Sequence, residues 1–264
     1  MEYDFNGLPS AKVIEIVKNA PEDDFEMIAK LLSCDSRKSV AAALSSKAKR
    51  IEALGAERER LGQLKMTEAS IYSRGYKIIA GVDEVGRGPL FGPVVAAAVA
   101  MRPESWILYV NDSKKLSHAK RQAISQEILS EAISFGIGIV EHDIIDEINI
   151  LNATKIAMVQ AVKAMEIRAE YLISDSVWVD AGMPCLAVDQ GDEKCYSVAA
   201  ASIIAKVERD AMMLDYAELY PEYDLGQNKG YGTKAHIDAI LRFGPTPHHR
   251  MSFLGNLKGM GQMI

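Results

Sequence analysis

Two adjacent carboxylates before a glycine-rich turn are the residues of this chain best suited to chemistry. Asp83 and Glu84 follow the short apolar run 78–82, and the turn Gly86-Arg87-Gly88 begins two residues later. Hard divalent cations such as Mg²⁺ prefer carboxylate oxygens, and a backbone without Cβ atoms can approach a ligand closely. Neighbours on a regular strand point to opposite faces, so both acids can serve one site only where the strand ends or bulges. The pattern indicates a metal and phosphate site; the alternative is a polar strand end before an ordinary turn.

Asp175 is a third candidate carboxylate, at the end of a strand predicted for residues 171–175. An acid at the carboxyl end of a buried strand in an α/β fold is well placed to line a site. A cap for the following turn is the alternative. Asp180 is a rival a few residues later, in the irregular segment before Gly182.

Asp210 is the fourth candidate, inside a long helix predicted for residues 196–219. Lys206 precedes it by four residues and therefore lies one turn away on the same face. An exposed ion pair is the alternative. Ile203 and Val207 share this side of the helix, which favours a buried position for the pair.

Other catalytic patterns do not occur in the sequence. There is no serine or cysteine nucleophile elbow, and Gly86-Arg87-Gly88 lacks the Gly-Lys-Ser/Thr ending of a P-loop. His248-His249 beside Arg250 is more typical of a polar surface or a phosphate contact than of a zinc site. Reduced thiols, and with them a cytoplasmic location, are the simplest interpretation of three cysteines that fit no zinc spacing, Cys34, Cys185 and Cys195. The longest apolar run, 94–101, is too short to cross a bilayer, so we expect no membrane association.

The charge distribution is compatible with a polyanionic partner despite a net charge of −6. Residues 36–66 carry eight Lys/Arg against three Glu, a local charge of +5, and residues 225–264 carry five Lys/Arg against one Asp, a local charge of +4. Two basic flanks around an acidic centre could hold a nucleic acid at the flanks and metal ions at the centre. The alternative is a pair of solvated basic faces.

The order of predicted elements favours an α/β protein with helical ends. Residues 1–70 have helical periodicity, and from residue 76 onward strands alternate with helices. The short connection 86–92 favours an antiparallel hairpin. We therefore expect a helical N-terminal extension at 1–70, a catalytic α/β domain with a mixed sheet at 71–222 and a helical C-terminal part at 223–264. Strands are predicted at 77–85, 94–101, 135–141, 171–175 and 186–188, and helices at about 40–64, 117–134, 152–168, 196–219 and 233–242.

Six motifs in a fixed order resemble the ribonuclease HII family of bacteria. The resemblance covers residues 76 to about 255, and one such motif could arise by chance whereas the ordered set would not. The motifs are Gly81-Val82-Asp83-Glu84-Val85-Gly86-Arg87-Gly88-Pro89, Asn111-Asp112-Ser113-Lys114-Lys115-Leu116-Ser117, Ile145-Asp146-Glu147-Ile148-Asn149-Ile150, Ala200-Ala201-Ser202-Ile203-Ile204-Ala205-Lys206-Val207-Glu208-Arg209-Asp210, Lys229-Gly230-Tyr231-Gly232-Thr233 and His249-Arg250-Met251-Ser252-Phe253.

The resemblance implies a ribonuclease H-like fold and a metal-dependent endoribonuclease. It implies that Mg²⁺ or Mn²⁺ ions are held by four acids, with Asp83 bridging two ions: Asp83, Glu84, Asp175 and Asp210. The implied reaction is hydrolysis on the 5′ side of a ribonucleotide, with one ion activating water and the other stabilising the leaving oxygen. The implied substrates are RNA–DNA hybrids and DNA duplexes that contain single ribonucleotides, cut by a monomer without a membrane partner.

The same resemblance assigns contacts to the nucleic acid. The 2′-hydroxyl distinguishes RNA from DNA. In the family the turn matching Gly86-Arg87-Gly88 reads this group, and a tyrosine matching Tyr231 packs against the sugar. Candidates for phosphate contacts are Lys114, Lys115, Lys229 and Arg250, with solvated surface lysines as the alternative.

The chain departs from the family pattern mainly around Asp175. Serines stand at positions 174 and 176, Gln190 replaces a lysine, and residues 176–185 match poorly. The rival functions are a ribonuclease HIII, a junction resolvase on the same fold, and a catalytically silent nucleic-acid-binding module. Ribonuclease HIII is disfavoured because it has a β-rich N-terminal domain and Glu as its last acid. A calcium-binding protein is disfavoured because no EF-hand loop occurs.

Overall fold

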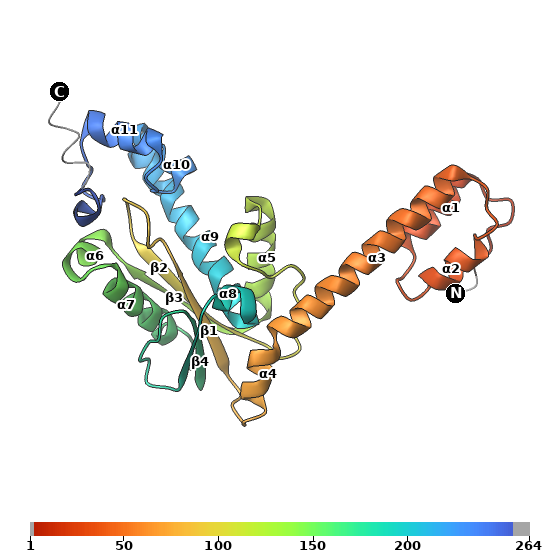
Figure 1. Ribbon diagram of the computed structural model, residues 1–264, viewed down its shortest axis with the longest axis horizontal. Coiled ribbons are helices and arrows are strands. Elements are labelled where there is room, and N and C mark those ends of the chain that lie inside the picture. Colours follow the sequence, from red (N-terminus) through yellow and green to blue (C-terminus); the bar gives the residue numbers. More distant parts are fainter. Residues whose placement is uncertain (1–2, 256–264) are drawn as a thin grey trace. The chain divides into compact units, whose positions relative to one another are not determined.

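The computed structural model describes residues 3–255 of the 264-residue chain (Figure 1). The chain divides into two compact units between Arg60 and Leu61. This division falls inside helix α3 (Lys38–Leu64), which begins in the first unit and ends in the second. The boundaries expected at 70/71 and 222/223 stay predictions.

The first unit is a small helical body. Helices α1 (Ser10–Asn19) and α2 (Phe25–Leu31) pack with the first turns of α3. Their buried side chains recur at the three- and four-residue spacing of a helix face, which gives the unit its own apolar core. This core comprises Val13, Val17, Ala20, Ile28, Leu32, Val40 and Ala43.

The second unit is built on a mixed five-stranded sheet, which confirms the expected α/β class. The strand order is β3-β2-β1-β4-β5. Pairing is antiparallel between β3, β2 and β1 and parallel between β1, β4 and β5, and the predicted hairpin joins β1 to β2. The strands are β1 (Ile79–Val85), β2 (Val94–Met101), β3 (Ala132–Val140), β4 (Tyr171–Asp175) and β5 (Cys185–Val188).

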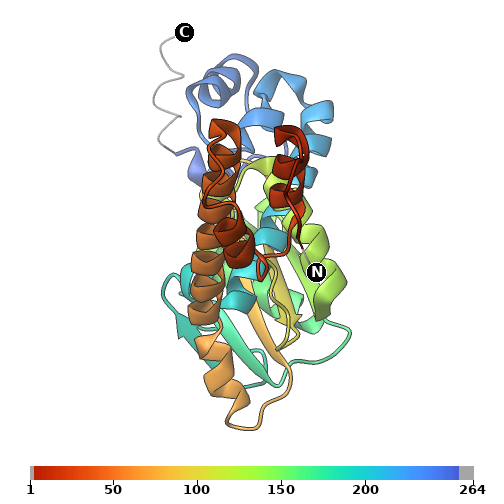
Figure 2. The same cartoon turned by 90° about the vertical axis from the view of Figure 1, so that its right-hand side faces the viewer.

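Two helices cover opposite faces of this sheet (Figures 1 and 2). Helix α7 (Ile150–Lys163) packs on the core that contains Val82 and Ala96, and helix α9 (Tyr196–Leu219) packs on the core that contains Ala97 and Val99. Helix α9 lies directly on β1, because a Cβ at Gly81 would be 2.2 Å from the backbone of Ser197. This close approach brings residues of α9 next to the end of β1.

Shorter helices complete the second unit. They are α4 (Met66–Tyr72), α5 (His118–Glu131), α6 (His142–Ile148), α8 (Gly191–Lys194), α10 (Leu225–Asn228) and α11 (Lys234–Phe243), with the 3₁₀ helices η1 (Ser113–Lys115), η2 (Pro221–Tyr223) and η3 (Met251–Phe253). The C-terminal helices enclose a further apolar core around Phe91, Met213 and Tyr223. Across residues 3–255, no helix is both long and apolar enough to cross a membrane.

Several predicted element boundaries were wrong by one to five residues, most clearly at α7 and β3. Helix α7 begins at Ile150 instead of Asn152, because Asn149 adopts φ 69° and its side chain accepts the N–H of Asn152 as the N-cap. It ends at Lys163 instead of about 168. Strand β3 begins at Ala132 because α5 stops at Glu131.

Candidate active site

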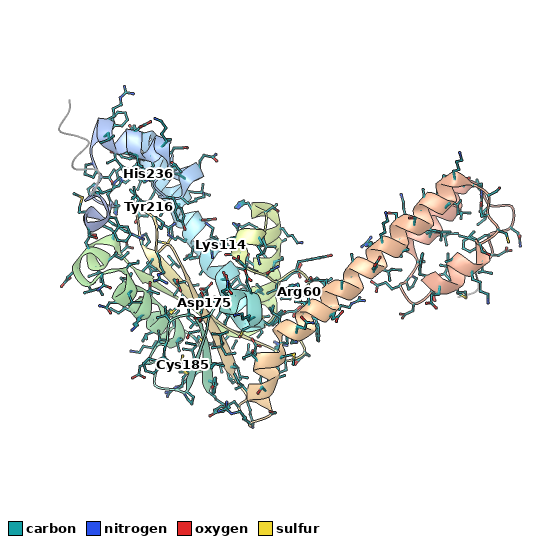
Figure 3. All side chains as sticks on the ribbon, viewed as in Figure 1. Arg60, Lys114, Asp175, Cys185, Tyr216 and His236 are labelled. Carbon is teal, nitrogen blue, oxygen red and sulfur yellow. The ribbon has the colours of Figure 1, made fainter. Side chains whose placement is uncertain are left out.

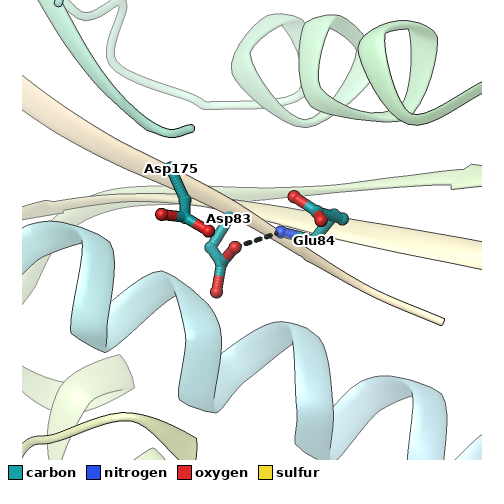
Figure 4. A group of neighbouring side chains, drawn as sticks. All are labelled: Asp83, Glu84 and Asp175. Carbon is teal, nitrogen blue, oxygen red and sulfur yellow. Dashed lines mark hydrogen bonds between the residues drawn. The ribbon is translucent and has the colours of Figure 1, made fainter. Parts of the chain in front are cut away.

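Three of the four candidate acids meet at the carboxyl ends of two neighbouring parallel strands. Asp83 and Glu84 lie near the end of β1, and Asp175 is the last residue of β4. Since β1 and β4 pair in parallel with Val82 opposite Ser174, Asp83 and Asp175 emerge side by side. One potential ligand atom from each acid lies within 4.8 Å of those of the other two (Figure 4).

Asp83 and Glu84 share the site although they are neighbours on a strand. Asp83 pairs with Ala97 and Glu84 with Ala96, which belong to the cores on opposite faces of the sheet. The strand ends one residue later, at Val85. An Asp83 carboxylate oxygen also accepts the N–H of Glu84 at 2.7 Å (Figure 4). The strand therefore ends next to the two acids, as the sequence requires if both carboxylates are to serve one site.

The electrostatics of the acid cluster suit a divalent cation. Burial raises the pKa of Asp83 well above its ordinary value, and the neighbouring Glu84 and Asp175 carboxylates raise it further. Burial also raises the pKa of Glu84, although Arg87 opposes this change. The buried Oε2 atom of Glu84 has no hydrogen-bond partner in the described part of the chain. A hard cation would offset the repulsion and supply this missing partner, so the three side chains fit a Mg²⁺ or Mn²⁺ site.

Asp175 is oriented by its own neighbourhood. The N–H of Gly191 donates to its Oδ1 atom at 2.7 Å, and the hydroxyl of Ser176 donates to the same atom at 3.2 Å. The serine that departs from the family pattern therefore contacts the carboxylate directly. Asp180, the rival candidate, accepts the N–H of Gly182 and is not among the three clustered acids.

Asp210 does not belong to the cluster of three acids. Its Oδ1 atom accepts from Lys206 Nζ at 2.6 Å, and its Oδ2 atom accepts from Arg121 Nη1 at 3.3 Å. Asp210 is buried and Lys206 is half-buried, which agrees with the position that the helical phase favoured. Both carboxylate oxygens already have cationic partners, so a role for Asp210 as a metal ligand stays a prediction.

A cavity of about 280 Å³ opens over the acids. It contains several polar side chains that the sequence analysis did not assign to the site. Ser113 and Ser202 share a hydrogen bond of 3.1 Å, and Lys206 reaches the same cavity, which Tyr231, the predicted sugar contact, also lines. The full lining is Asp83, Glu84, Val85, Ser113, Lys114, Asp175, Asp192, Ser202, Lys206 and Tyr231.

A larger cavity of about 440 Å³ lies elsewhere, between α7 and residues 178–180. Its lining is mainly apolar and includes Ile156, Val159 and Trp178. It contains none of the clustered acids. The smaller cavity is therefore the better candidate for the chemistry.

Asp192 is a cavity residue that the sequence analysis missed. It follows Gly191, whose N–H holds Asp175. Burial raises the pKa of Asp192, and the nearby Asp112 and Asp175 carboxylates raise it further. Asp192 could have been identified as the neighbour of Gly191 only if the hydrogen bond between Gly191 and Asp175 were already known.

The candidate nucleic-acid residues occupy different environments. Lys114 is exposed beside the cavity, with Nζ 3.9 Å from Asp112 and 4.0 Å from Asp192 (Figure 3). Lys115 is exposed and pairs with Glu193 at 2.8 Å. Burial lowers the pKa of Lys229 despite the opposing effect of Asp210.

The glycine-arginine-glycine turn lies next to Tyr231. A Cβ at Gly88 would be 3.6 Å from the Tyr231 ring, an ordinary contact distance. Gly86 adopts φ +94°, a conformation that favours glycine, and a Cβ there would lie 2.2 Å from Arg209 Nε. The turn is therefore packed between Arg209 on one side and the Tyr231 ring on the other.

The structure does not support Arg250 as a phosphate contact. Its side chain is fully buried. Its guanidinium donates to the carbonyl oxygens of Gly92 at 2.8 Å, Arg87 at 3.1 Å and Gly86 at 2.7 Å. Because these three bonds hold the guanidinium inside the protein, Arg250 does not present it to a ligand.

Comparison with known proteins agrees with this geometry. The family model described as Ribonuclease HII matches residues 80–255, and the Ribonuclease HII N-terminal domain matches residues 11–72. A ribonuclease HII of Clostridioides difficile is 44% identical over 93% of this chain and 97% of its own length. A ribonuclease HII of Caldanaerobacter subterraneus subsp. tengcongensis is 50% identical over 77% of this chain and 85% of its own length.

A solved structure supports the same assignment. The ribonuclease H2 of Pyrococcus horikoshii OT3 superimposes with a TM-score of 0.61 at 25% identity, covering 71% of this chain and all of that one. The likeness confirms the ribonuclease H-like fold expected from the sequence. Together with the family match over most of the second unit, it shows that the chain belongs to the ribonuclease HII family of metal-dependent endoribonucleases.

Proposed function

We propose that the protein hydrolyses the phosphodiester on the 5′ side of a ribonucleotide, both in RNA–DNA hybrids and at single ribonucleotides within duplex DNA. The observation that carries the proposal is the position of the three clustered acids in one cavity with Tyr231, whose ring lies against the glycine-arginine-glycine turn. A candidate cation site therefore lies in the same cavity as Tyr231, the side chain that would contact the sugar. Products would carry 3′-hydroxyl and 5′-phosphate ends.

Asp83, Glu84 and Asp175 would hold the divalent ions, with Asp210 as the candidate fourth ligand. Bound Mg²⁺ or Mn²⁺ would activate water and stabilise the leaving 3′ oxygen. Lys206 and Arg121 hold the Asp210 carboxylate. Asp210 would therefore have to exchange at least one of these partners to become a ligand.

Selectivity for a ribonucleotide would come from the backbone of the glycine-arginine-glycine turn. In the described chain, the N–H groups of Gly86, Arg87 and Gly88 have no protein acceptor. An N–H group can donate to a 2′-hydroxyl oxygen, which DNA lacks. The Tyr231 ring, adjacent to Gly88, would pack on the sugar. Lys114, Lys115 and Lys229 would contact phosphates.

We propose further that the protein acts as a cytoplasmic monomer on nucleic acid without a membrane partner. The family match disfavours a junction resolvase or a silent binding module. The clustered acids also favour an active enzyme, because a binding module has no need of three buried or half-buried carboxylates in one cavity.

The first experiment compares a labelled DNA duplex containing one ribonucleotide with its all-DNA twin, in Mg²⁺, Mn²⁺ or EDTA. We expect cutting of the first duplex alone, only with metal, and 5′ of the ribonucleotide. Equal cutting of both duplexes would indicate a general nuclease instead. Binding of both duplexes and of a long hybrid without any cutting would support a silent binding module.

A further inference from the structure

The loop 86–93, which carries the glycine-arginine-glycine turn, is held from inside the protein by two buried arginines. Arg209 of α9 donates to the carbonyl oxygens of Pro93 at 3.0 Å, Phe91 at 3.1 Å and Lys229 at 2.9 Å. It therefore fastens the loop to α9 and to the segment that leads to Tyr231. One guanidinium thus connects the two parts of the structure that would contact the sugar.

Arg250 holds the other half of the same loop. Its three bonds to the carbonyl oxygens of Gly86, Arg87 and Gly92 complement those of Arg209, and the two arginines have no acceptor in common. Both side chains are fully buried, and neither forms a salt bridge within residues 3–255. Burial lowers the pKa of Arg209 to about 10 and that of Arg250 to about 9.

Burying two guanidinium groups without carboxylate partners costs free energy, so we expect their fixed geometry to contribute something in return. A buried cation without a carboxylate partner loses hydration that a surface position would keep. Backbone carbonyls of a surface loop could be satisfied by water at much lower cost. What the arginines add is a fixed direction for the carbonyls of Gly86, Arg87, Phe91, Gly92 and Pro93.

The carbonyls and the N–H groups of the loop have different partners. Further along the loop, the N–H of Leu90 donates to Gly230 and that of Gly92 to His248. At the turn itself, carbonyls of Gly86 and Arg87 are bound to Arg250 while the three consecutive N–H groups of residues 86–88 have no protein acceptor. Fixing a carbonyl also fixes the peptide plane and with it the N–H of the next residue.

The segment around Tyr231 is tied to the same framework by two neutral histidines. The Tyr231 carbonyl can only accept, so His236 Nδ1 donates to it at 2.9 Å. His249 Nε2 then donates to His236 Nε2 at 3.1 Å, and His249 Nδ1 accepts the N–H of Thr246 at 2.9 Å. His249 directly precedes Arg250, so the backbone of Tyr231 and the loop 86–93 share one support.

Asp146 of α6 secures that support near the surface. Its carboxylate accepts the N–H groups of Met251 at 2.6 Å and Ser252 at 3.0 Å, and it also accepts the Ser252 hydroxyl. These residues follow Arg250 immediately. Asp146 is partly exposed and outside the cavity, so it can be changed with little effect on the core.

We propose that Arg209 and Arg250 are positioning residues for substrate selectivity: Arg250 binds the carbonyls of Gly86 and Arg87 and so fixes the N–H groups of Arg87 and Gly88, where a 2′-hydroxyl is read, while Arg209 holds the far end of loop 86–93. Asp146 supports Arg250 in this role. The inference rests on the proposed readout of the 2′-hydroxyl. It adds that selectivity depends on residues that never touch the substrate.

The test measures affinity for the duplex with one ribonucleotide and for its all-DNA twin, by fluorescence anisotropy in EDTA, together with kcat and KM in Mg²⁺. The variants are Arg250→Lys, Arg209→Lys and Asp146→Ala. The control is Arg242→Gln, an exposed arginine of α11 that stacks on Phe243 and has no hydrogen bond to loop 86–93 within the described residues. Tm reports whether each variant folds, and Asp146→Ala carries the test if the buried arginine variants do not.

We expect the ratio of the two affinities to fall about tenfold, equivalent to ~1.4 kcal/mol, with affinity for the all-DNA twin nearly unchanged and KM affected more than kcat. Arg242→Gln should keep the wild-type ratio. An unchanged ratio in Asp146→Ala and in every folded arginine variant would overturn the inference, as would equal loss of affinity for both duplexes. A wild-type protein that binds and cuts both duplexes equally would instead overturn the proposed readout, and the inference with it.

Discussion

At the scale of single residues, the acid cluster is electrostatically unfavourable until a cation arrives. Asp83 is buried beside two other carboxylates, and both burial and these neighbours raise its pKa. A carboxyl group whose pKa is raised by folding stabilises the protein while it is protonated, and this contribution is lost as the pH rises through the pKa of the folded state. The metal-free protein should therefore lose stability towards alkaline pH.

The variant Asp83→Asn tests this linkage. In EDTA at pH 8 we expect its Tm to exceed that of the wild type by a few degrees, since ~1 kcal/mol corresponds to about 2–4 °C in a domain of this size. The difference should shrink at pH 5, where more of the wild-type carboxyl is protonated. Adding Mg²⁺ should raise the Tm of the wild type and have little effect on the variant, whose cleavage activity should be lost.

Thermal unfolding followed by circular dichroism at both pH values provides the measurement. The matched control is Asp215→Asn, an exposed acid on α9. It should show neither the pH-dependent difference nor a change in response to Mg²⁺. A variant Asp83→Asn that is less stable than the wild type at pH 8 without metal would contradict the electrostatic argument.

At the scale of elements, the sequence reveals strand ends better than it reveals burial. The run before Asp83 and the strand ending at Asp175 could be predicted because strand periodicity is local. The buried position of Arg250 could not be predicted, because its acceptors Gly86 and Gly92 lie 164 and 158 residues away. The two histidines that precede Arg250 suggest a polar surface instead. The position of Asp192 in the cavity could not be predicted either, because it depends on the hydrogen bond between Gly191 and Asp175.

A second element-level feature is the cap of α9, the helix that carries Ser202, Lys206 and Asp210. Glu68 of α4 accepts the N–H and the hydroxyl of Ser197 at 2.8 and 2.7 Å, at the first turn of α9. Its position is buried, and burial raises the pKa of Glu68. Residues before the catalytic sheet therefore satisfy a donor that the helix cannot satisfy itself.

The variant Glu68→Ala should lower the free energy of unfolding by about 1–2 kcal/mol, as expected for loss of a helix cap. Glu68→Gln should lose less, because an amide oxygen can accept the same two bonds and carries no charge to be buried. Urea denaturation of both variants and the wild type at pH 8 gives the comparison. Equal destabilisation by alanine and glutamine would show that the cap is not what Glu68 contributes.

At the scale of the whole molecule, the basic side chains of the first unit divide into those paired with acids and those without a salt bridge in the described residues. In the first unit, Arg37 and Arg58 are paired with Asp35 and Glu22. Lys38 and Lys49 are exposed on α3 and form no salt bridge within residues 3–255. The positive charge that the sequence places at 36–66 is therefore only partly available, and these two lysines are a direct place to test the hypothesis that it adds affinity for duplexes.

The double variant Lys38→Gln/Lys49→Gln should bind duplexes more weakly and with a shallower dependence on salt. Each phosphate contact contributes about 0.9 to the slope of log affinity against log salt, so losing both contacts should reduce its magnitude by up to ~1.8. Anisotropy titrations between low and physiological salt measure the slope. Lys12→Gln, whose lysine is already paired with Glu15, is the matched control and should leave the slope unchanged.

The kcat of the double variant should match that of the wild type, because both lysines belong to the first unit and all three clustered acids belong to the second. An unchanged slope would mean that Lys38 and Lys49 do not contact the phosphates of the duplex and that their charges serve only solvation.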